Sequence, residues 1–593
     1  MRCAALAVAG VPIILRVTPL RAFILTSLLL VCACRAATSA APAAPGNTSA
    51  SAPQAAAAAP RLDPDVAATV DQVLSSADHP GLRWGEIRDA VPALKPLYDD
   101  EPDRLFWFDG TKPSPALEPT LATLAAAGDH GLDAGDYDAA TLAEQWSQQR
   151  KGEWAPADRA LFDIGVSVAA MRMLKAVFVG RVDPATIYWG YDVKTKKADF
   201  TTLLREVRGG KSLAEALDAL SPQVTHYARA RRTLADYKKL AGAGEPPRVP
   251  ELPKGRAKVA AGQGWDGIAA LAARLRTIGD LPAEAGVEGD VYSAPLVAAV
   301  KRFQERHGLD ADGTIGAATI TVLNISLADR VRQIELAMER MRWLPVLSEE
   351  PNVFVNLPLF RMWATDPTTG DEPLRMNVVV GKSLGHQTPI FVEKMEYVIF
   401  RPYWTPPPSI TVREIVPHIR RDPSYFEREN LEIVESGEDA APTFEPTPEN
   451  LSKVVAGRLH IRQRPGPKNS LGLAKFIFPN ASNVYMHGTP AQQLFSRVRR
   501  DFSHGCIRLE DPARFAEWVL RDQPEWTRQR IDTAMQGTRP VRVNLKQPLT
   551  VVLFYDTVHV NSEGVVFFVR DIYDDDRELD MALKRGYPYP VKA

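Results

Sequence analysis

The sequence predicts a multidomain α+β protein, with helical domains first and a β-rich domain last. A chain of 593 residues is too long for one hydrophobic core. Between 62 and 344 apolar residues recur at helical spacing, and from Pro351 onward they alternate with polar residues as in half-buried strands. A run rich in proline, 245–254, separates two of the helical parts and marks a domain boundary.

The first 36 residues have the order of an export signal. Arg16 and Arg21 precede an apolar run, 22–31, that is short for a stable membrane span and is followed by small residues. We expect 1–36 to be a signal peptide or an anchor, and the Ala/Pro/Ser-rich segment 37–61 to be a linker that cannot fold. Val31-Cys32-Ala33-Cys34 also resembles a lipobox, in which Cys34 would be lipidated.

Residues 62–254 are expected to form a helical domain. The run from Ala160 to Val177 is apolar at helical spacing, and Gly180 is expected to end that helix. No catalytic constellation is visible in this part of the chain.

Two amphipathic helices and a characteristic motif follow at 255–326. The motif, from Phe303-Gln304 through Gly308-Leu309, Asp312-Gly313-Thr314 and Ile315-Gly316 to Thr319, resembles that of the small three-helix peptidoglycan-binding module. The glycines permit turns, and Thr314 is expected to cap the next helix. An ordinary helical subdomain without a ligand is the alternative. A connecting helix is expected at 327–350.

The β-rich domain is expected at 351–571. An insertion at about 408–470, helical and acidic in character, interrupts its strands and could cover a site. The strands 549–555 and 565–569 are expected to form a hairpin, and 572–593 a C-terminal tail.

One cysteine and one histidine carry the chemistry. Cys3, Cys32 and Cys34 lie in the export signal, so Cys506 is an unpaired thiol in an exported chain. A neutral thiol is a weak nucleophile and needs a base, for which His487, 19 residues upstream, is the candidate. Backbone N–H groups around Gly505 and Cys506 could hold a developing oxyanion.

These residues resemble the L,D-transpeptidase family. Its two motifs occur here in the expected order, as His487-Gly488-Thr489 and Ser503-His504-Gly505-Cys506-Ile507-Arg508. Further fragments agree, namely Val380-Gly381-Lys382 with Gln387-Thr388-Pro389, Trp404 to Ile410, Gly466 to Gly472, and Phe476 to Asn480. The resemblance implies a helical scaffold domain, a peptidoglycan-binding module and a β-rich L,D-transpeptidase catalytic domain with an inserted capping segment, as in large Gram-negative members.

The resemblance also implies a reaction and its site. Cys506 would attack the third residue of a tetrapeptide stem, expel the terminal D-alanine, and pass the acyl group to a diaminopimelate amine, with His487 moving the proton. The donor site would be shaped by Ser503, His504 and Gly505, and Arg508 would orient the stem. Gly488 and Trp404 are also expected among the residues that bind the substrate or the oxyanion. No metal or other cofactor is implied. The implied location is the periplasm, the partners are stem peptides, glycan, cell-wall synthases and carboxypeptidases, and carbapenems would acylate Cys506.

Other functions remain open. The same thiol could hydrolyse stem peptides as a carboxypeptidase or endopeptidase, and a wall-binding scaffold with an inactive catalytic domain is a third class. Cys506 could also be a small buried hydrophobe, or a zinc ligand together with His460, His487 and His504, although the spacing does not match a compact zinc site. A formal net charge of -1 argues against a nucleic-acid binder, and no nucleic-acid partner is expected.

Overall fold

The computed structural model describes residues 63–100, 105–152, 154–287, 289–346, 350–438 and 440–586. The expected signal or anchor at 1–36, the linker at 37–61 and the lipidation at Cys34 lie outside these residues. Within the described stretches, no helix combines the length and the apolar character that crossing a bilayer requires.

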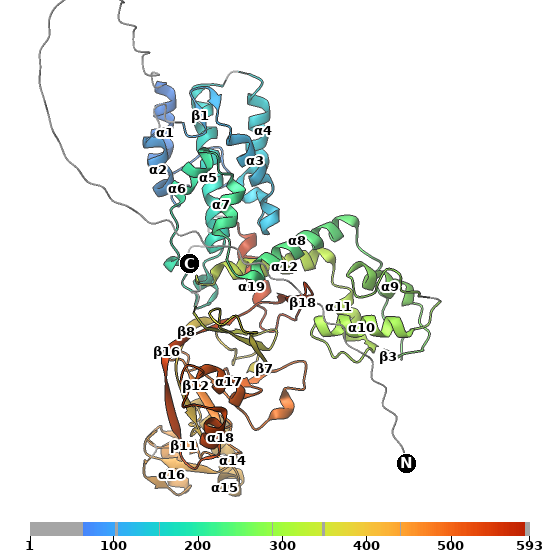
Figure 1. Ribbon diagram of the computed structural model, residues 1–593, viewed down its shortest axis with the longest axis vertical. Helices are drawn as coiled ribbons and strands as arrows, with labels where there is room; N and C mark the ends of the chain where they lie inside the picture. The colour runs from blue at the N-terminus through green and yellow to red at the C-terminus, as the bar shows by residue number, and fades with distance from the viewer. Residues whose placement is uncertain are drawn as a thin grey trace, which may run out of the picture. The chain divides into compact units, whose positions relative to one another are not determined.

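The N-terminal helical domain is built around one central helix, α5 (Pro156–Val179). Pro156 occupies its first turn, and Gly180, with a φ of 86°, follows its last residue as expected. Because α5 is buried on nearly all sides, other helices pack around it (Figure 1). These are α1 (Pro64–Ser76), α2 (Val91–Asp99), α3 (Leu117–Ala125), α4 (Ala139–Gln149), α6 (Phe200–Arg208) and α7 (Leu213–Leu220), with a small hairpin of β1 (Phe108–Asp109) and β2 (Lys112–Pro113).

A three-helix module follows the long helix α8 (Thr225–Ala243). It contains α9 (Ile268–Thr277), α10 (Ala294–Arg306), α11 (Ala317–Leu323) and the short strands β3 (Lys258–Val259) and β4 (Ile315–Gly316). The Gln304 carboxamide accepts a hydrogen bond from Gly313 N at 2.8 Å and donates one to the Thr314 carbonyl at 2.9 Å. The expected Thr314 cap is wrong, because α11 begins at Ala317, after Gly316, without a side-chain cap.

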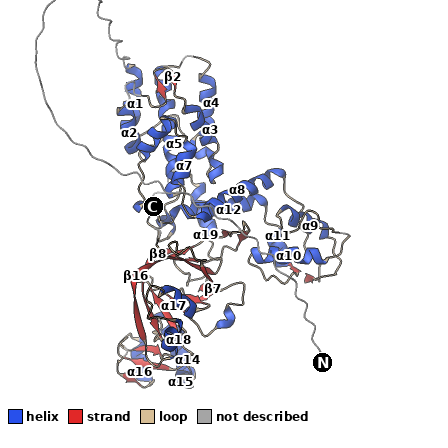
Figure 2. Cartoon of the chain, viewed as in Figure 1, coloured by secondary structure: helices blue, strands red, loops and turns tan. Residues whose placement is uncertain are grey.

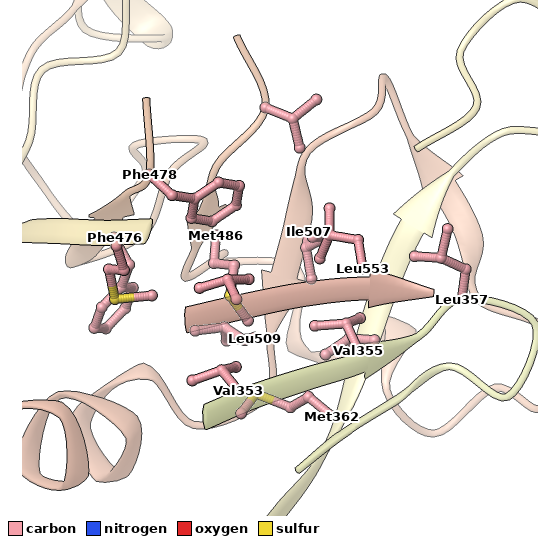
Figure 3. Packing of buried hydrophobic residues seen from close by; sticks show 14 of the residues in the cluster. Val353, Val355, Leu357, Met362, Phe476, Phe478, Met486, Ile507, Leu509 and Leu553 are labelled. Atoms are coloured by element: carbon pink, nitrogen blue, oxygen red, sulfur yellow. The ribbon is translucent and has the colours of Figure 1, made fainter. Parts of the chain in front are cut away.

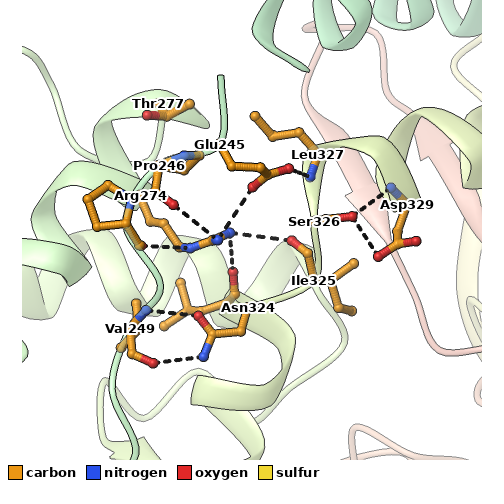
Figure 4. A network of polar contacts seen from close by, with 12 residues as sticks. Glu245, Pro246, Val249, Arg274, Thr277, Asn324, Ile325, Ser326, Leu327 and Asp329 are labelled. Atoms are coloured by element: carbon orange, nitrogen blue, oxygen red, sulfur yellow. Dashed lines mark hydrogen bonds and ion pairs between the residues drawn. The ribbon is translucent and has the colours of Figure 1, made fainter. Parts of the chain in front are cut away.

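The proline-rich connector is hydrogen-bonded along this module (Figure 4). Val249 exchanges two hydrogen bonds with the Asn324 side chain, at 2.9 and 2.8 Å. Arg274 donates to the carbonyls of Pro246 and Leu323, and Glu245 accepts from the backbone of Leu327, where α12 begins. The helix α12 (Leu327–Trp343) then packs against α8.

A nine-stranded sheet in the C-terminal domain closes into a β-barrel (Figure 2). Its strand order is β14-β7-β15-β13-β12-β8-β16-β5-β6, and a further β6–β7 pairing closes the ring. Side chains of β5, β6, β12, β13, β15 and β16 meet in its core (Figure 3). The strands are β5 (Asn352–Asn356), β6 (Arg361–Thr365), β7 (Leu374–Gly381), β8 (Phe391–Phe400), β12 (Ala474–Ile477), β13 (Met486–His487), β14 (Asp501–Ser503), β15 (Ile507–Leu509) and β16 (Val541–Phe554).

The insertion between β8 and β12 has its own core and its own three-stranded sheet, in the order β10-β9-β11. It is therefore a small subdomain with strands as well as the expected helices. Its elements are α13 (Pro408–Ile410), the π-helical turn η5 (Thr411–Ile415), α14 (Val416–Arg421), α15 (Ser424–Arg428), β9 (Leu431–Val434), β10 (Thr443–Phe444), α16 (Pro448–Val455) and β11 (His460–Gln463).

The end of the chain differs from expectation in two places. The expected hairpin of 549–555 with 565–569 is wrong: its arms are β17 (Val558–Val560) and β18 (Val566–Phe568), while 549–554 belong to the long strand β16. The segment 572–593, expected as a tail, contains the helix α19 (Asp575–Lys584), which packs on α12 through the ion pair of Arg340 with Asp576. Two shorter helices, α17 (Pro512–Val519) and α18 (Arg528–Gln536), cover the barrel core.

Candidate active site

Cys506 and His487 lie on adjacent parallel strands of the barrel. Met486 pairs with Ile507 and His487 pairs with Arg508, so Cys506 directly precedes β15 and lies diagonally across from His487. Met486 and Ile507 are fully buried in the barrel core. Because successive side chains of a strand point to opposite faces, His487, Cys506 and Arg508 share the other face of the sheet.

His487 is oriented by the peptide group that follows it. Its Nδ1 lies 2.5 Å from the Gly488 carbonyl oxygen, which can only accept a hydrogen bond, so Nδ1 carries the proton and Nε2 is left as an acceptor. Burial lowers the pKa of His487 to about 3, with further lowering by Arg508 and Lys475. The ring is therefore neutral at pH 7, the form in which an imidazole can accept a proton.

The thiol is also held in its neutral form. Burial raises the pKa of Cys506 above its ordinary value, against the opposing effects of hydrogen bonds from Tyr485 and the positive charges of Lys475 and Arg508. Both groups are thus neutral at rest, with the thiol and the imidazole on the same face of neighbouring strands.

Lys475 and Tyr485 were missed by sequence reasoning. Lys475 pairs in register with His487 on the neighbouring strand β12, and its ammonium lies 4.0 Å from the centre of the Tyr485 ring. Burial lowers the pKa of Lys475, and Cys506 opposes that effect when its thiol is ionised. The alternation of side chains along a strand could have identified both residues. Tyr485 lies two residues before His487, so their side chains point to the same face of the sheet, and Lys475 is the one charged residue in its four-residue strand.

A hydrogen-bonded turn presents Cys506. The Ser503 hydroxyl accepts from Gly505 N at 3.1 Å and donates to the Cys506 carbonyl at 2.5 Å. Gly505 has a φ of 117°, a conformation that favours glycine. Since Ser503 is buried and occupies the Gly505 N–H, these two residues shape the turn, and the Gly505 N–H is not free to hold an oxyanion.

The loop between β7 and β8 and the segment just before α19 support this turn. The Thr388 hydroxyl donates to the Gly505 carbonyl at 2.8 Å and accepts from Gly381 N at 2.9 Å. The Tyr573 hydroxyl in turn accepts from Thr388 N and donates to the Gly381 carbonyl at 2.7 Å. Tyr573 belongs to the region expected as a tail, and nothing in the local sequence pattern singled it out.

The remaining candidates occupy distinct places. His504 Nε2 lies 3.1 Å from Glu414 in the insertion, and burial is the main cause that lowers the pKa of His504. Arg508 has a buried Nε without a hydrogen-bond partner among the described residues. Gly488 is confined, because a Cβ there would lie 3.1 Å from Pro512. Trp404 lies at the root of the insertion, where its backbone pairs with Gln463 at 3.1 and 2.7 Å.

No cluster of three or more His, Cys, Asp or Glu side chains that could hold a metal ion occurs in the part of the chain that the structure describes. His460, considered above as a zinc ligand, is exposed on β11 in the sheet of the insertion. The structure therefore does not bring His460 into a ligand set with the other histidines.

Comparisons with known proteins divide the chain in the same way. Residues 92–234 match a family described as "Scaffold domain", 266–323 match "Putative peptidoglycan binding domain", and 350–543 match "L,D-transpeptidase catalytic domain". A protein of Haemophilus influenzae named "Putative L,D-transpeptidase" is 27% identical over 249 residues, which cover 42% of this chain and 49% of that protein. The match thus spans about half the length of that relative. The chain is therefore built from a scaffold domain, a peptidoglycan-binding module and an L,D-transpeptidase catalytic domain.

Proposed function

We propose that this chain is a peptidoglycan L,D-transpeptidase that forms three-to-three cross-links through an acyl-enzyme on Cys506. The observation that carries the proposal is the pairing of β13 with β15, which places a histidine and a cysteine on one face of the barrel in a domain that matches this family. The peptidoglycan-binding match at 266–323 supports the same substrate.

In the first half-reaction the sulfur of Cys506 attacks the carbonyl carbon of the third residue of a tetrapeptide stem. The thiol proton moves to Nε2 of His487 as the C–S bond forms, and the same proton leaves with the amine of D-alanine when the C–N bond breaks. The neutral state of both groups at rest suits this route, because each proton is transferred only as charge develops. The product is a thioester.

In the second half-reaction a diaminopimelate amine of another stem attacks the thioester carbonyl. His487 accepts the amine proton and returns it to sulfur as the C–S bond breaks. Arg508 lies on the same face, and its Nε has no hydrogen-bond partner among the described residues, so it is suited to hold a stem carboxylate. We propose that the insertion covers the donor site, since Glu414 reaches His504 beside the nucleophile.

Hydrolysis is the second candidate reaction for this site. Water in place of the amine would make the protein a carboxypeptidase or an endopeptidase, with the same residues in the same roles.

The wider role follows from the substrate. We propose that the protein works outside the cytoplasm, in the periplasm, held by its N-terminal segment or by a lipidated Cys34. Its partners there would be the synthases and carboxypeptidases that supply tetrapeptide stems. Carbapenems, which carry a reactive carbonyl, would acylate the same sulfur.

The test is a muropeptide assay of Cys506→Ala with purified disaccharide-tetrapeptide. We expect the wild-type chain to form dimers and release D-alanine, and the variant to form none, with Ser562→Ala on the exposed tip of the β17–β18 hairpin as the control. Dimers from the Cys506→Ala protein would refute the nucleophile. Tripeptide monomers without dimers from the wild type would identify the hydrolase instead.

A further inference from the structure

A second site is suggested by a cavity of about 1190 Å³ that does not include Cys506 or His487. Its walls come from the peptidoglycan-binding module around 305–325, from α12, and from three parts of the C-terminal domain, 358–361, 498–500 and 567–580. The module reaches this wall directly, because Arg306 Nη1 donates to the Val566 carbonyl at 3.3 Å and His307 stacks on Phe568.

The positively charged side chains that line the cavity are all arginines. The lining contains seven arginines and no lysine. A planar guanidinium can bind a carboxylate with two parallel hydrogen bonds, which an ammonium cannot do. The lining therefore favours recognition of a planar anion over a general attraction of negative charge.

Four of these arginines have no carboxylate partner within 4.0 Å among the described residues. These are Arg330, Arg361, Arg500 and Arg570. The other three are paired: Arg332 with Asp580 at 2.7 Å, Arg499 with Asp501 at 2.6 Å, and Arg577 with Asp574 at 3.9 Å.

Two of the unpaired arginines are buried. Arg330 is 7% exposed and donates to Gln333 at 2.8 Å, and Arg500 is 9% exposed and donates to the neutral oxygens of Val378, Arg497, Phe360 and Asn377. Burial lowers the pKa of both to about 10. A buried cation without a counter-ion lowers stability, so an anionic ligand would relieve a real cost here.

The acidic residues of the lining do not supply that counter-ion. Asp571 accepts from Tyr555 and from the backbone of Asp575 and Asp576, while Asp576 and Asp580 pair with Arg340 and Arg332. The Asp329 carboxylate accepts from the Ser326 hydroxyl at 2.6 Å, and the Asp329 N–H donates to that same hydroxyl, which caps α12. Glu305 is the remaining carboxylate and is exposed on the module.

We propose that this cavity is a second peptidoglycan site, which binds a carboxylate of a stem peptide with Arg330, Arg361, Arg500 and Arg570. The choice of ligand rests on the proposed function, whereas the anion site rests on the arginines alone. Glutamyl and diaminopimelyl groups carry the planar carboxylates that the lining suits, and the volume accommodates several residues.

The position of the cavity indicates what a second peptidoglycan site would do. Arg499 and Arg500 directly precede β14, and the nucleophile turn directly follows it, so three residues separate the cavity wall from His504. A stem bound here would keep the wall polymer beside the catalytic domain while another stem occupies the thiol. The cavity would therefore raise the local concentration of substrate, as linked binding sites do.

Binding of a fluorescent disaccharide-tripeptide tests the proposal, since this ligand lacks the D-alanine that the enzyme would expel. Fluorescence anisotropy of the full chain is compared with that of the double variant Arg361→Gln/Arg570→Gln, which changes two exposed residues and spares the buried ones. Arg232→Gln, at an exposed arginine on α8 outside the cavity, is the matched control.

We expect the Kd of the double variant to rise at least tenfold, with that of Arg232→Gln unchanged. The same tripeptide with amidated carboxylates should not compete, and inorganic phosphate should compete only at far higher concentration than the tripeptide. An unchanged Kd in the double variant, or equal competition by the amidated peptide or by phosphate, would overturn the proposal. Loss of cross-linking in Cys506→Ala is a separate readout, so either proposal can fail without the other.

Discussion

The neutral histidine makes a quantitative prediction about pH. With a pKa of about 3, His487 would be only about 1% protonated at pH 5, so the base would stay available. With the ordinary value of 6.5, the neutral fraction would fall about 25-fold between pH 7 and pH 5. We therefore expect the rate at which a carbapenem acylates Cys506 to change less than about twofold over this range.

Intact-protein mass spectrometry at a series of times measures that rate at each pH. A sample returned from pH 5 to pH 7 controls for irreversible loss of the fold. The direct measurement is the NMR titration of the His487 ring, with its signal assigned by its absence in His487→Gln. A ring that titrates between pH 6 and 7, or a rate that falls more than tenfold by pH 5, would refute the reasoning.

The same pKa makes a prediction about stability. The unfolded chain takes up a proton at this histidine near pH 6.5, whereas the folded chain does so only near pH 3. The contribution of His487 to the free energy of unfolding is therefore fully present above pH 6.5 and is lost as the pH falls towards 3. The difference corresponds to about 5 kcal/mol in total, or about 1.4 kcal/mol for each pH unit.

Two substitutions test the support of the site. Gly472→Ala should lower the transfer rate about tenfold or more and cost about 1–2 kcal/mol of stability. Residue 472 has a φ of 63°, and a Cβ there would lie 2.6 Å from Thr489 N and 2.7 Å from Gly488 C. This is the peptide group whose carbonyl orients the histidine. Gly466→Ala in the same loop, where a Cβ meets no atom within 4 Å, should leave kcat and the melting temperature unchanged. Lys475→Met should raise the pKa of the Cys506 thiol further and slow its alkylation by iodoacetamide several-fold at pH 8, and an unchanged alkylation rate would exclude an electrostatic role for this lysine.

Much of the fold could be predicted from the sequence because its signals are local. The apolar run that ends at Gly180 predicts α5, and the phase of the strands around His487 and Cys506 depends on a two-residue period. The motifs around these two residues then indicate the family, although they do not say which side chains surround the sulfur.

What could not be predicted depends on contacts between distant segments. Lys475 reaches the site only because β12 pairs with β13, and Tyr573 supports the turn from a segment 67 residues beyond Cys506 (573 − 506). The helix α19 has only Leu579 and Ala582 buried, too few apolar positions for a helical period to be visible. The protonation state could not be predicted either, because burial, which opposes charge on both groups, is a property of the folded barrel.

The contact between His487 and the Gly488 carbonyl has a consequence for how the site tolerates mutation. Many catalytic histidines are aligned by an aspartate or asparagine side chain, which a single codon change can delete. Here the aligning oxygen is part of the polypeptide itself and is present whatever residue occupies position 488. Side-chain substitution therefore cannot delete this acceptor, and only a shift in the local path of the chain would break the contact.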